Sequence, residues 1–399
     1  MKILFYASSP LQHIGYSRVA NVLSNYLVTN GHEVFYFSVG VDSDEVKRFV
    51  EPSIKMIPVH PQLLGFRRAK GLPDAVEDYF GVDMFEEAVK QVEPEIVLVY
   101  NDIIVVNRII NQLMNIPKTY KLVVYLDLVY EYEKSFLVDA IEKAVDQLIV
   151  FSNCWREHLM TIGYKKDIQV LKNGFTECEP IPNAKTMLGF KEDDFIVLNC
   201  NRNSYRKGLD LTVEAFLRFL KMNDCDPKIK IFLNCSFQEK NGYDIHNLFK
   251  VECLQLNLDY EKVMNQHVYK PLKILSEEMM HLLYEACDIG INTCLGEGFG
   301  LCNIEHGAKG KPQIVSNVGG LKDNFEKIKT VVEPVAEIYI PTIMDFHGGI
   351  GKVCRAEDFS KKLNQLYHDK ELYELMSVNT KNFIQKNFKW KSILDSWKL

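Results

Sequence analysis

The sequence predicts an α/β protein made of two domains, each a doubly wound parallel sheet with helices on both faces. Three observations lead to this fold class. Short apolar runs rich in β-branched and aromatic residues alternate with longer amphipathic stretches of helical spacing. The apolar runs are continuous, as in strands that are buried on both faces. The pattern also begins twice within 399 residues, a length that accommodates two domains.

The first half begins as a strand–helix–strand unit. Residues 3–7 (ILFYA) and 33–39 (EVFYFSV) predict strands, and the apolar spacing from Val19 to Leu27 predicts the helix between them. Further buried strands are predicted at 95–100, 121–128 and 147–152.

The second half restarts after a Pro-containing polar stretch, residues 177–194, which has the composition of a connection. We therefore predict an N-terminal domain over 1–172 and a C-terminal domain over 173–384, with the terminal helix 385–399 crossing back to complete the first domain. Strands are predicted in the second half at 195–200, 228–235, 267–270, 288–294 and 312–317, and helices at 211–222 and 277–286.

Composition excludes several classes of protein. With 47% hydrophobic and 25% charged residues the chain is neither disordered nor fibrous. The net charge of −6 offers no general cationic surface, so we expect no nucleic-acid partner. Ten cysteines without a CxxC pair fit the reduced thiols of a cytosol. The apolar stretch at residues 3–7 is too short for a signal peptide, and no run approaches about 18 apolar residues, so we expect a cytoplasmic protein without a transmembrane segment.

The segment 294–312 carries the most chemical information. Glycines at three alternate positions, 296, 298 and 300, lie between a buried strand and a helix predicted to start near Leu301. Without side chains, the backbone N–H groups and the positive end of the helix dipole can approach an anion such as a phosphate. A tight turn that merely requires glycine is the alternative, and it is favoured where such a turn stands alone.

Two carboxylates in this segment change that balance. Glu297 lies on the loop, and Glu305 follows eight residues later, in the second turn of the predicted helix. A phosphate repels a carboxylate, so sugar hydroxyls that donate hydrogen bonds explain the pair better.

Two cations occupy the corresponding turn after the strand at 195–200. Arg202 and Lys207 are five residues apart, close enough for both to reach one diphosphate. The alternative is a pair of solvated cations at a helix entry, where the helix dipole disfavours positive charge. That mismatch favours a binding function.

Together these residues resemble the donor-site signature of the family 4 retaining glycosyltransferases of the GT-B fold. The resemblance rests on Arg202 and Lys207, and on EGFGLCNIE with Glu297 and Glu305. It extends to VFSNCWREHLMTIGY, VLKNGF, ACDIGIN and SNVGGLKD, whereas the first half matches mainly in architecture and in IGYSRVANVLSNYL.

The resemblance implies two Rossmann-like domains facing across a cleft. By similarity, Arg202 and Lys207 bind the donor diphosphate and take the place of a metal ion, so that neither metal nor other cofactor is required. Glu305 binds the ribose hydroxyls, and Glu297 lies near hydroxyls of the donor sugar. The remaining donor-binding residues implied by the family are Gly15, Tyr16, Ser17, Gly298, Phe299, Gly300 and Leu301.

One departure from the family concerns a histidine that many members carry after a middle strand of the first domain. Here the nearest polar residue is Asp127, which either contacts a sugar hydroxyl or the acceptor, or ends the strand and caps a turn. We include Asp127 with Glu297, Arg202 and Lys207 in the expected catalytic set and assign no general base. His13 is a weaker candidate.

The first interpretation is a retaining, metal-independent glycosyltransferase. It would move a hexose from a nucleoside-diphosphate sugar, GDP-mannose or UDP-glucose, to a hydroxyl of a glycan, protein or lipid acceptor. The alternatives are a catalytically silent sugar-nucleotide or glycan-binding protein, and an epimerase or phosphorylase on the same fold. A dinucleotide oxidoreductase is a weaker interpretation, since the GxGxxG motif is missing after the first strand.

The oligomeric state, a homodimer included, is open. We interpret Asp42–Asp44 as a solvated turn and 65–70 (GFRRAK) as a surface loop.

Overall fold

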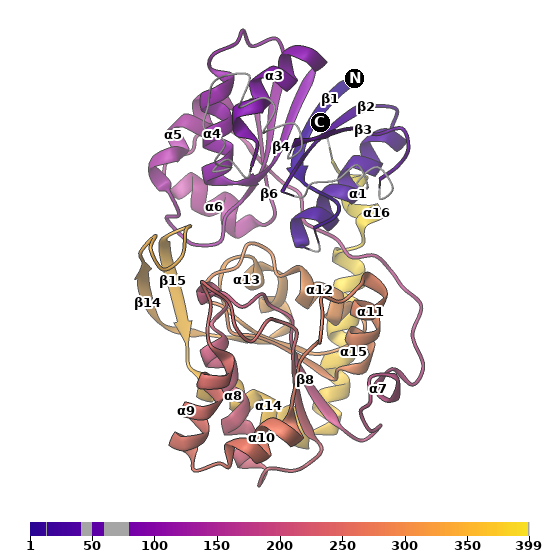
Figure 1. The fold of residues 1–399 in the computed structure, drawn as a ribbon, viewed down its shortest axis with the longest axis vertical. Helices are drawn as coiled ribbons and strands as arrows, with labels where there is room; N and C mark the ends of the chain where they lie inside the picture. Colours follow the sequence, from indigo (N-terminus) through magenta and orange to yellow (C-terminus); the bar gives the residue numbers. More distant parts are fainter. Residues whose placement is uncertain (13, 41–49, 60–79, 398) are drawn as a thin grey trace. The chain divides into compact units, whose positions relative to one another are not determined.

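The computed structural model of the chain divides into two units, which are described separately (Figure 1). It describes residues 1–12, 14–40, 50–59, 80–397 and 399. The first unit contains Met1–Leu128, Lys134–Lys172 and Ser396–Leu399, and the second contains Val129–Glu133 and Asn173–Asp395.

The first unit is built on one parallel sheet with the strand order β3-β2-β1-β4-β5-β6-β7. The order reverses between β1 and β4, which in open α/β sheets is the place where ligands bind at the carboxyl ends of the strands. The strands are β1 (Lys2–Ser8), β2 (Glu33–Val39), β3 (Lys55–Pro58), β4 (Ile96–Asp102), β5 (Lys121–Asp127), β6 (Gln147–Val150) and β7 (Ile168–Val170).

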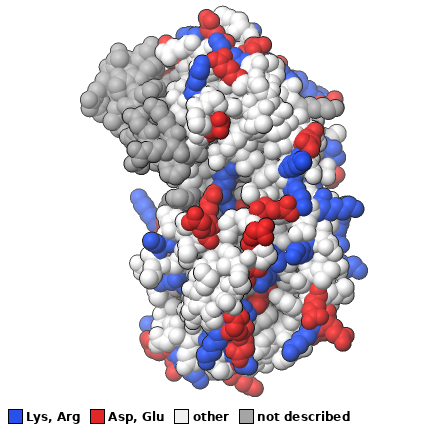
Figure 2. All heavy atoms as spheres, turned by 90° about the vertical axis from the view of Figure 1, so that its right-hand side faces the viewer, with Lys and Arg blue, Asp and Glu red and all other residues white. Residues whose placement is uncertain are grey.

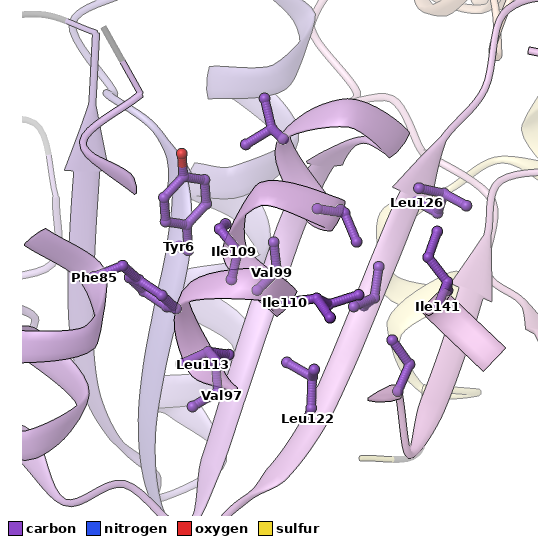
Figure 3. Close-up of a cluster of buried hydrophobic side chains, with 14 of the residues drawn as sticks. Tyr6, Phe85, Val97, Val99, Ile109, Ile110, Leu113, Leu122, Leu126 and Ile141 are labelled. Atoms are coloured by element: carbon purple, nitrogen blue, oxygen red, sulfur yellow. The ribbon is translucent and has the colours of Figure 1, made fainter. Parts of the chain in front are cut away.

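Helices cover both faces of this sheet (Figure 1). Their apolar stripes pack against strands that are buried on both sides, as the uninterrupted burial of β4 shows. Figure 3 shows part of one core, in which Val97 and Val99 of β4 lie beside Ile109, Ile110 and Leu113. The helices are α1 (Gly15–Thr29), α3 (Val82–Val92), α4 (Ile103–Leu113), η2 (Ser135–Leu137), α5 (Val138–Ala144) and α6 (Asn153–Thr161).

The second unit repeats this arrangement. Its parallel sheet has the order β10-β9-β8-β11-β12-β13, with the reversal between β8 and β11. The strands are β8 (Phe195–Asn199), β9 (Ile229–Leu233), β10 (Val268–Tyr269), β11 (Ile289–Asn292), β12 (Gln313–Ser316) and β13 (Val331–Val332). The helices are α7 (Ala184–Met187), η3 (Tyr205–Lys207), α8 (Leu209–Met222), α9 (Ile245–Leu256), α10 (Tyr260–His267), α11 (Glu277–Ala286), α12 (Leu301–Ala308), α13 (Gly319–Phe325), η4 (Glu326–Ile328), α14 (Ala356–His368), α15 (Lys370–Asn387) and α16 (Trp390–Leu394).

An antiparallel hairpin of β14 (Pro334–Ile340) and β15 (Gly349–Cys354) also belongs to the second unit, and the sequence did not predict it. The far edge of β15 contacts the segment Val129–Glu133, which we call the strap. Ile350 N donates to the Glu131 carbonyl at 2.8 Å. The strap is therefore part of the second unit although it follows β5 of the first unit along the chain.

The two doubly wound parallel-sheet units confirm the predicted fold class; that they face each other across a cleft stays a prediction. The C-terminal stretch differs from the prediction, because the second unit runs to Asp395 and only Ser396–Leu399 belongs to the first. The reason is packing: the Phe388 ring lies 5.9 Å from the Phe299 ring within the second unit. Beyond Asp395, Trp397 lies 5.7 Å from Tyr26 of α1.

Among the described residues, no helix is both long and apolar enough to span a membrane. Figure 2 shows one face of the molecule, on which acidic and basic side chains are interspersed. The described part of that face therefore carries no extended surface of one sign, consistent with the small net charge.

Candidate functional site

Two turns of the second unit meet at the carboxyl ends of β8 and β11. Leu295 N donates to the Arg206 carbonyl at 2.8 Å, and Thr293 Oγ1 donates to the Gly208 carbonyl at 2.7 Å. Gly208 has φ +57°, and a Cβ there would lie 2.4 Å from the Thr293 carbonyl oxygen. Only glycine fits this crossing without strain. The turn that carries Lys207 is thereby fixed against the glycine loop.

The glycine loop ends at the N-terminus of α12, as the sequence predicts. Gly300 is the N-cap with φ +83°, and Asn303 N and Ile304 N both donate to its carbonyl. The N–H of Leu301 lies in the first turn, where a helix has no internal acceptor and where the dipole favours an anion. Phe299 is fixed by Asn324, whose Nδ2 donates to the Phe299 carbonyl at 2.7 Å.

The backbone of the glycine loop also contacts the backbone of α13 closely. A Cβ on Gly320 would lie 2.1 Å from the Gly298 carbonyl oxygen, and Gly320 N donates to the Glu297 carbonyl at 2.9 Å. Gly298 and Glu297 are therefore held from both sides, by α13 and by the turn after β8.

Glu297 lies at the centre of the site, between two cations. Its carboxylate forms an ion pair with Lys207 and lies 3.5 Å from the Arg206 guanidinium, while Arg206 Nη1 donates to the Gly296 carbonyl at 2.7 Å. The Glu297 residue is only 7% exposed. Burial alone would raise the pKa of this carboxyl, but Lys207 and Arg206 outweigh it and hold the pKa below its usual value.

The structure separates the two cations that the sequence singled out. Lys207 lies in the cluster, whereas Arg202 is exposed and forms no ion pair with any described residue. Arg206, which the sequence did not single out, is the second cation beside Glu297; that Arg202 binds the diphosphate stays a prediction. The signal for Arg206 was the Arg-Lys-Gly triplet itself, since two adjacent cations directly before a helix entry oppose the dipole.

Glu305 lies in the second turn of α12, at the predicted place. The buried Tyr284 of α11 donates to Glu305 Oε2 at 2.9 Å, and its ring stacks at 5.7 Å on His306. Burial lowers the pKa of His306 to about 3, so this imidazole is neutral at pH 7. Its Nδ1 accepts from Gln313 and its Nε2 faces the Cys287 carbonyl, which fixes one tautomer.

In the first unit, the predicted residues gather at the carboxyl ends of β1, β4 and β5. Gly15 begins α1, and the Tyr16 hydroxyl donates a short hydrogen bond to Asp127. Burial, then the Asp127 charge, raises the pKa of Tyr16 well above its usual value. Ser17 is buried on the same helix. Asp127 thus accepts a hydrogen bond from a buried tyrosine, a role that differs from both predicted ones, the contact with a sugar or acceptor hydroxyl and the capping of a turn.

Within the second unit, the strap packs directly against the glycine loop at Gly296. A Cβ on Gly296 would lie 2.3 Å from the Val129 carbonyl oxygen and 2.6 Å from the Tyr130 ring. Tyr130 OH donates to Asp345 Oδ2 of the hairpin at 3.1 Å. The sequence contained no signal for this contact, because the two segments are far apart along the chain.

Several sequence candidates, namely His13, the triplet at 42–44 and the loop 65–70, lie outside the described residues. Within the described ranges, no cluster of three or more His, Cys, Asp or Glu residues could hold a metal ion.

The sequence and the fold of the chain are similar to those of known proteins. The family model described as glycosyl transferases group 1 matches residues 181–383, slightly more than half of the chain. An uncharacterized glycosyltransferase of Methanocaldococcus jannaschii is 24% identical over 187 residues, 44% of this chain and 44% of that protein. The alpha-1,3/1,6-mannosyltransferase ALG2 of Dictyostelium discoideum is 26% identical over 268 residues, 60% of this chain and 61% of that protein. The matches thus span about half of each relative.

The fold comparison extends over both units. The structure of a sucrose-phosphate synthase from Thermosynechococcus elongatus superposes with a TM-score of 0.74 at 17% identity, covering 98% of this chain and 96% of that one. The two chains share a fold of two Rossmann-like α/β domains, the GT-B fold that the residues suggested. The matched segment 181–383 contains the Lys207 turn, the glycine loop and α12. The chain therefore belongs to the glycosyl transferases group 1 family.

Proposed function

We propose that the protein transfers a hexose from a nucleoside-diphosphate sugar to an acceptor hydroxyl, with retention of configuration and without a metal ion. The observation that carries this proposal is the cluster in which Lys207 pairs with the buried Glu297, three residues before the N-cap of α12, with Glu305 in the second turn of that helix.

The two kinds of group in the cluster match the two halves of such a donor. Lys207 and the first-turn N–H of Leu301 suit the diphosphate, because both offer positive charge and hydrogen-bond donors. Glu297 and Glu305 suit sugar and ribose hydroxyls, which donate to carboxylates. A plain phosphate-binding turn would not place two carboxylates beside its cations.

GDP-mannose and UDP-glucose are the proposed donors. ALG2, one of the relatives, is named as a mannosyltransferase, which favours the first; sucrose-phosphate synthase, the structural relative, shows only that the fold is shared. The acceptor carries a hydroxyl on a glycan, protein or lipid.

In the proposed reaction, the bond between the anomeric carbon and the diphosphate oxygen breaks while the acceptor oxygen bonds to the same carbon. Lys207 stabilises the negative charge that builds on the leaving nucleoside diphosphate, in the way that preformed positive groups stabilise a developing anion. The departing phosphate accepts the proton of the acceptor hydroxyl on the same face, so the protein supplies no general base.

The test is calorimetric titration of the purified protein with GDP-, UDP- and ADP-sugars in EDTA, repeated with Lys207→Ala. We expect saturable binding of one donor, weakened at least about hundredfold by the substitution, since one oxyanion contact contributes about 3 kcal/mol. Lys309→Ala is a matched control, because Lys309 pairs with Glu285 at 3.3 Å outside the cluster. Binding that depends on a divalent ion, or that survives Lys207→Ala, would contradict the proposal.

A further inference from the structure

If the protein binds a diphosphate, the Lys207 ammonium has two competing partners, the Glu297 carboxylate and the diphosphate. In the structure this ammonium pairs with the Glu297 carboxylate, and both side chains are largely buried, with exposed fractions of 12% and 10%. A diphosphate would draw the same ammonium to itself. Glu297 would then become a buried carboxylate that has lost its nearest counter-charge, which is among the costliest arrangements in a protein interior.

Arg206 is placed to prevent this. Its guanidinium lies 3.5 Å from Glu297 Oε1 and donates to the Gly296 carbonyl at 2.7 Å, while its own carbonyl accepts from Leu295 N at 2.8 Å. Arg206 is therefore tied to the glycine loop through both its guanidinium and its backbone carbonyl. Lysine is a flexible point charge that can change partner, whereas the planar arginine fork keeps two partners at once.

We propose, on the basis of the proposed function, that Arg206 is a positioning residue that keeps Glu297 charged and in place when Lys207 moves from Glu297 to the donor diphosphate. Lys207 is then the exchangeable partner of the carboxylate, and Arg206 is its permanent partner.

The other titratable groups around Arg206 and Glu297 do not replace Arg206. Burial raises the pKa of Cys294, so its thiol stays neutral. Tyr130, from the strap, is also neutral because burial raises its pKa, and its hydroxyl is occupied by Asp345. Asp345 adds negative charge and cannot stabilise a second carboxylate. Among the described groups, Lys207 and Arg206 are the two cations that lower the pKa of Glu297.

The first experiment measures the ionisation of Glu297 without any donor. Protein labelled with ¹³C at the glutamate side-chain carboxyl is titrated by NMR, and the signal lost in Glu297→Gln is that of Glu297. In Lys207→Met, which imitates the departure of Lys207, we expect Glu297 to remain charged at neutral pH. Adding Arg206→Met should raise its midpoint by at least about one pH unit, and adding Arg206→Lys instead should largely prevent that rise.

A matched control is Arg218→Met in the same Lys207→Met background. Arg218 pairs with Glu214 at 2.7 Å on α8, away from the cluster, so the Glu297 midpoint should not move. A midpoint that is the same with and without Arg206 overturns the inference, as does a rise of equal size in the Arg218 variant.

The second experiment adds the donor. In Arg206→Met, Lys207 is the remaining cation for Glu297, so a donor gains it only by leaving the carboxylate unpaired. Donor affinity should fall about tenfold at pH 7.5 and recover as the pH falls and Glu297 becomes protonated. The unsubstituted protein should show no such recovery. A uniform loss of affinity at all pH values would overturn the inference. If the unsubstituted protein binds no donor, the proposed function fails, while the NMR titration still decides the role of Arg206.

Discussion

Tyr284 orients Glu305 through a hydrogen bond. This bond is the simplest contact of the candidate site to test by substitution. The hydroxyl donates to Glu305 Oε2 at 2.9 Å from a side chain that is 1% exposed. Tyr284→Phe removes the donor without changing the ring. We expect donor affinity to fall about tenfold, since a hydrogen bond to a charged group contributes about 1.5 kcal/mol.

Calorimetric titration of Tyr284→Phe with the donor checks this expectation, and Tyr373→Phe is its control. Tyr373 also gives up one hydrogen bond, to the Asp288 carbonyl at 2.8 Å, but that bond lies outside the candidate site. Equal losses of affinity in the two variants would show that Tyr284 acts through general stability.

His306 links the site to the pH dependence of stability. Its pKa is lowered from 6.5 to about 3 in the folded protein because it is buried. The unfolded chain binds a proton below about pH 6.5 that the folded chain does not, so stability is complete above that pH and falls as the pH decreases toward 3. Between about pH 7.5 and about pH 5, the free energy of unfolding should fall by about 2 kcal/mol because of His306 alone.

Urea titrations at the two pH values measure that cost. His306→Asn should be less stable than the unsubstituted protein at neutral pH, yet it should lose less stability on acidification. His267, whose pKa burial also lowers, remains in both proteins and cancels in the comparison. An identical acid dependence in the two proteins would contradict this role of His306.

At the scale of residues, the sequence predicted part of the cluster that the structure shows around Glu297. Glu297, Lys207 and Glu305 could be predicted because charged groups at the ends of buried strands have few structural explanations. The contact between Arg206 and Glu297 could not be predicted, because it depends on the 3₁₀ turn Tyr205–Lys207, whose geometry the residue spacing does not show.

The crossing of the two strand-to-helix turns is the element on which the site depends. Gly208→Ala combines a strained φ of +57° with a Cβ 2.4 Å from the Thr293 carbonyl, whereas Gly189→Ala has φ +83° but nothing within 4 Å. We expect Gly189→Ala to cost about 1 kcal/mol and Gly208→Ala about 3 kcal/mol or more, with a loss of donor binding only in the second. Scanning calorimetry and donor titration check both, and equal effects would contradict the proposed crossing.

At the scale of elements, strands buried on both faces were predictable and exposed ones were not. The predicted strand at 33–39 has the bounds of β2, and the predicted helix 277–286 has those of α11. The hairpin β14–β15 escaped prediction because most of β14 is exposed or half-buried, so it lacks the continuous apolar run that identified the others.

At the scale of the whole molecule, the strap belongs to the second unit although the residues before and after it along the chain belong to the first. Glu133, with its side chain fully buried, accepts from Val129 N at 2.8 Å and from His347 Nδ1 at 2.6 Å, which ties the strap to the hairpin. No periodicity predicts such a contact, since its two sides are more than two hundred residues apart and only the fold brings them together.

Glu133→Ala should therefore loosen the second unit rather than the first. We expect amide hydrogen exchange to quicken at least about tenfold in β15 and in residues 294–297, while β1 and β4 keep their protection. Exchange followed by mass spectrometry measures this. Faster exchange confined to the first unit would contradict the assignment of the strap.

The central claim is that Lys207, Glu297 and the N-terminus of α12 form a diphosphate site, and a crystal structure with bound GDP or UDP tests it most directly. The account predicts a diphosphate oxygen within hydrogen-bonding distance of both Lys207 Nζ and the Leu301 N–H, with Arg206 still beside Glu297. A nucleotide bound elsewhere, or at this place with Lys207 still paired to Glu297, would contradict the account.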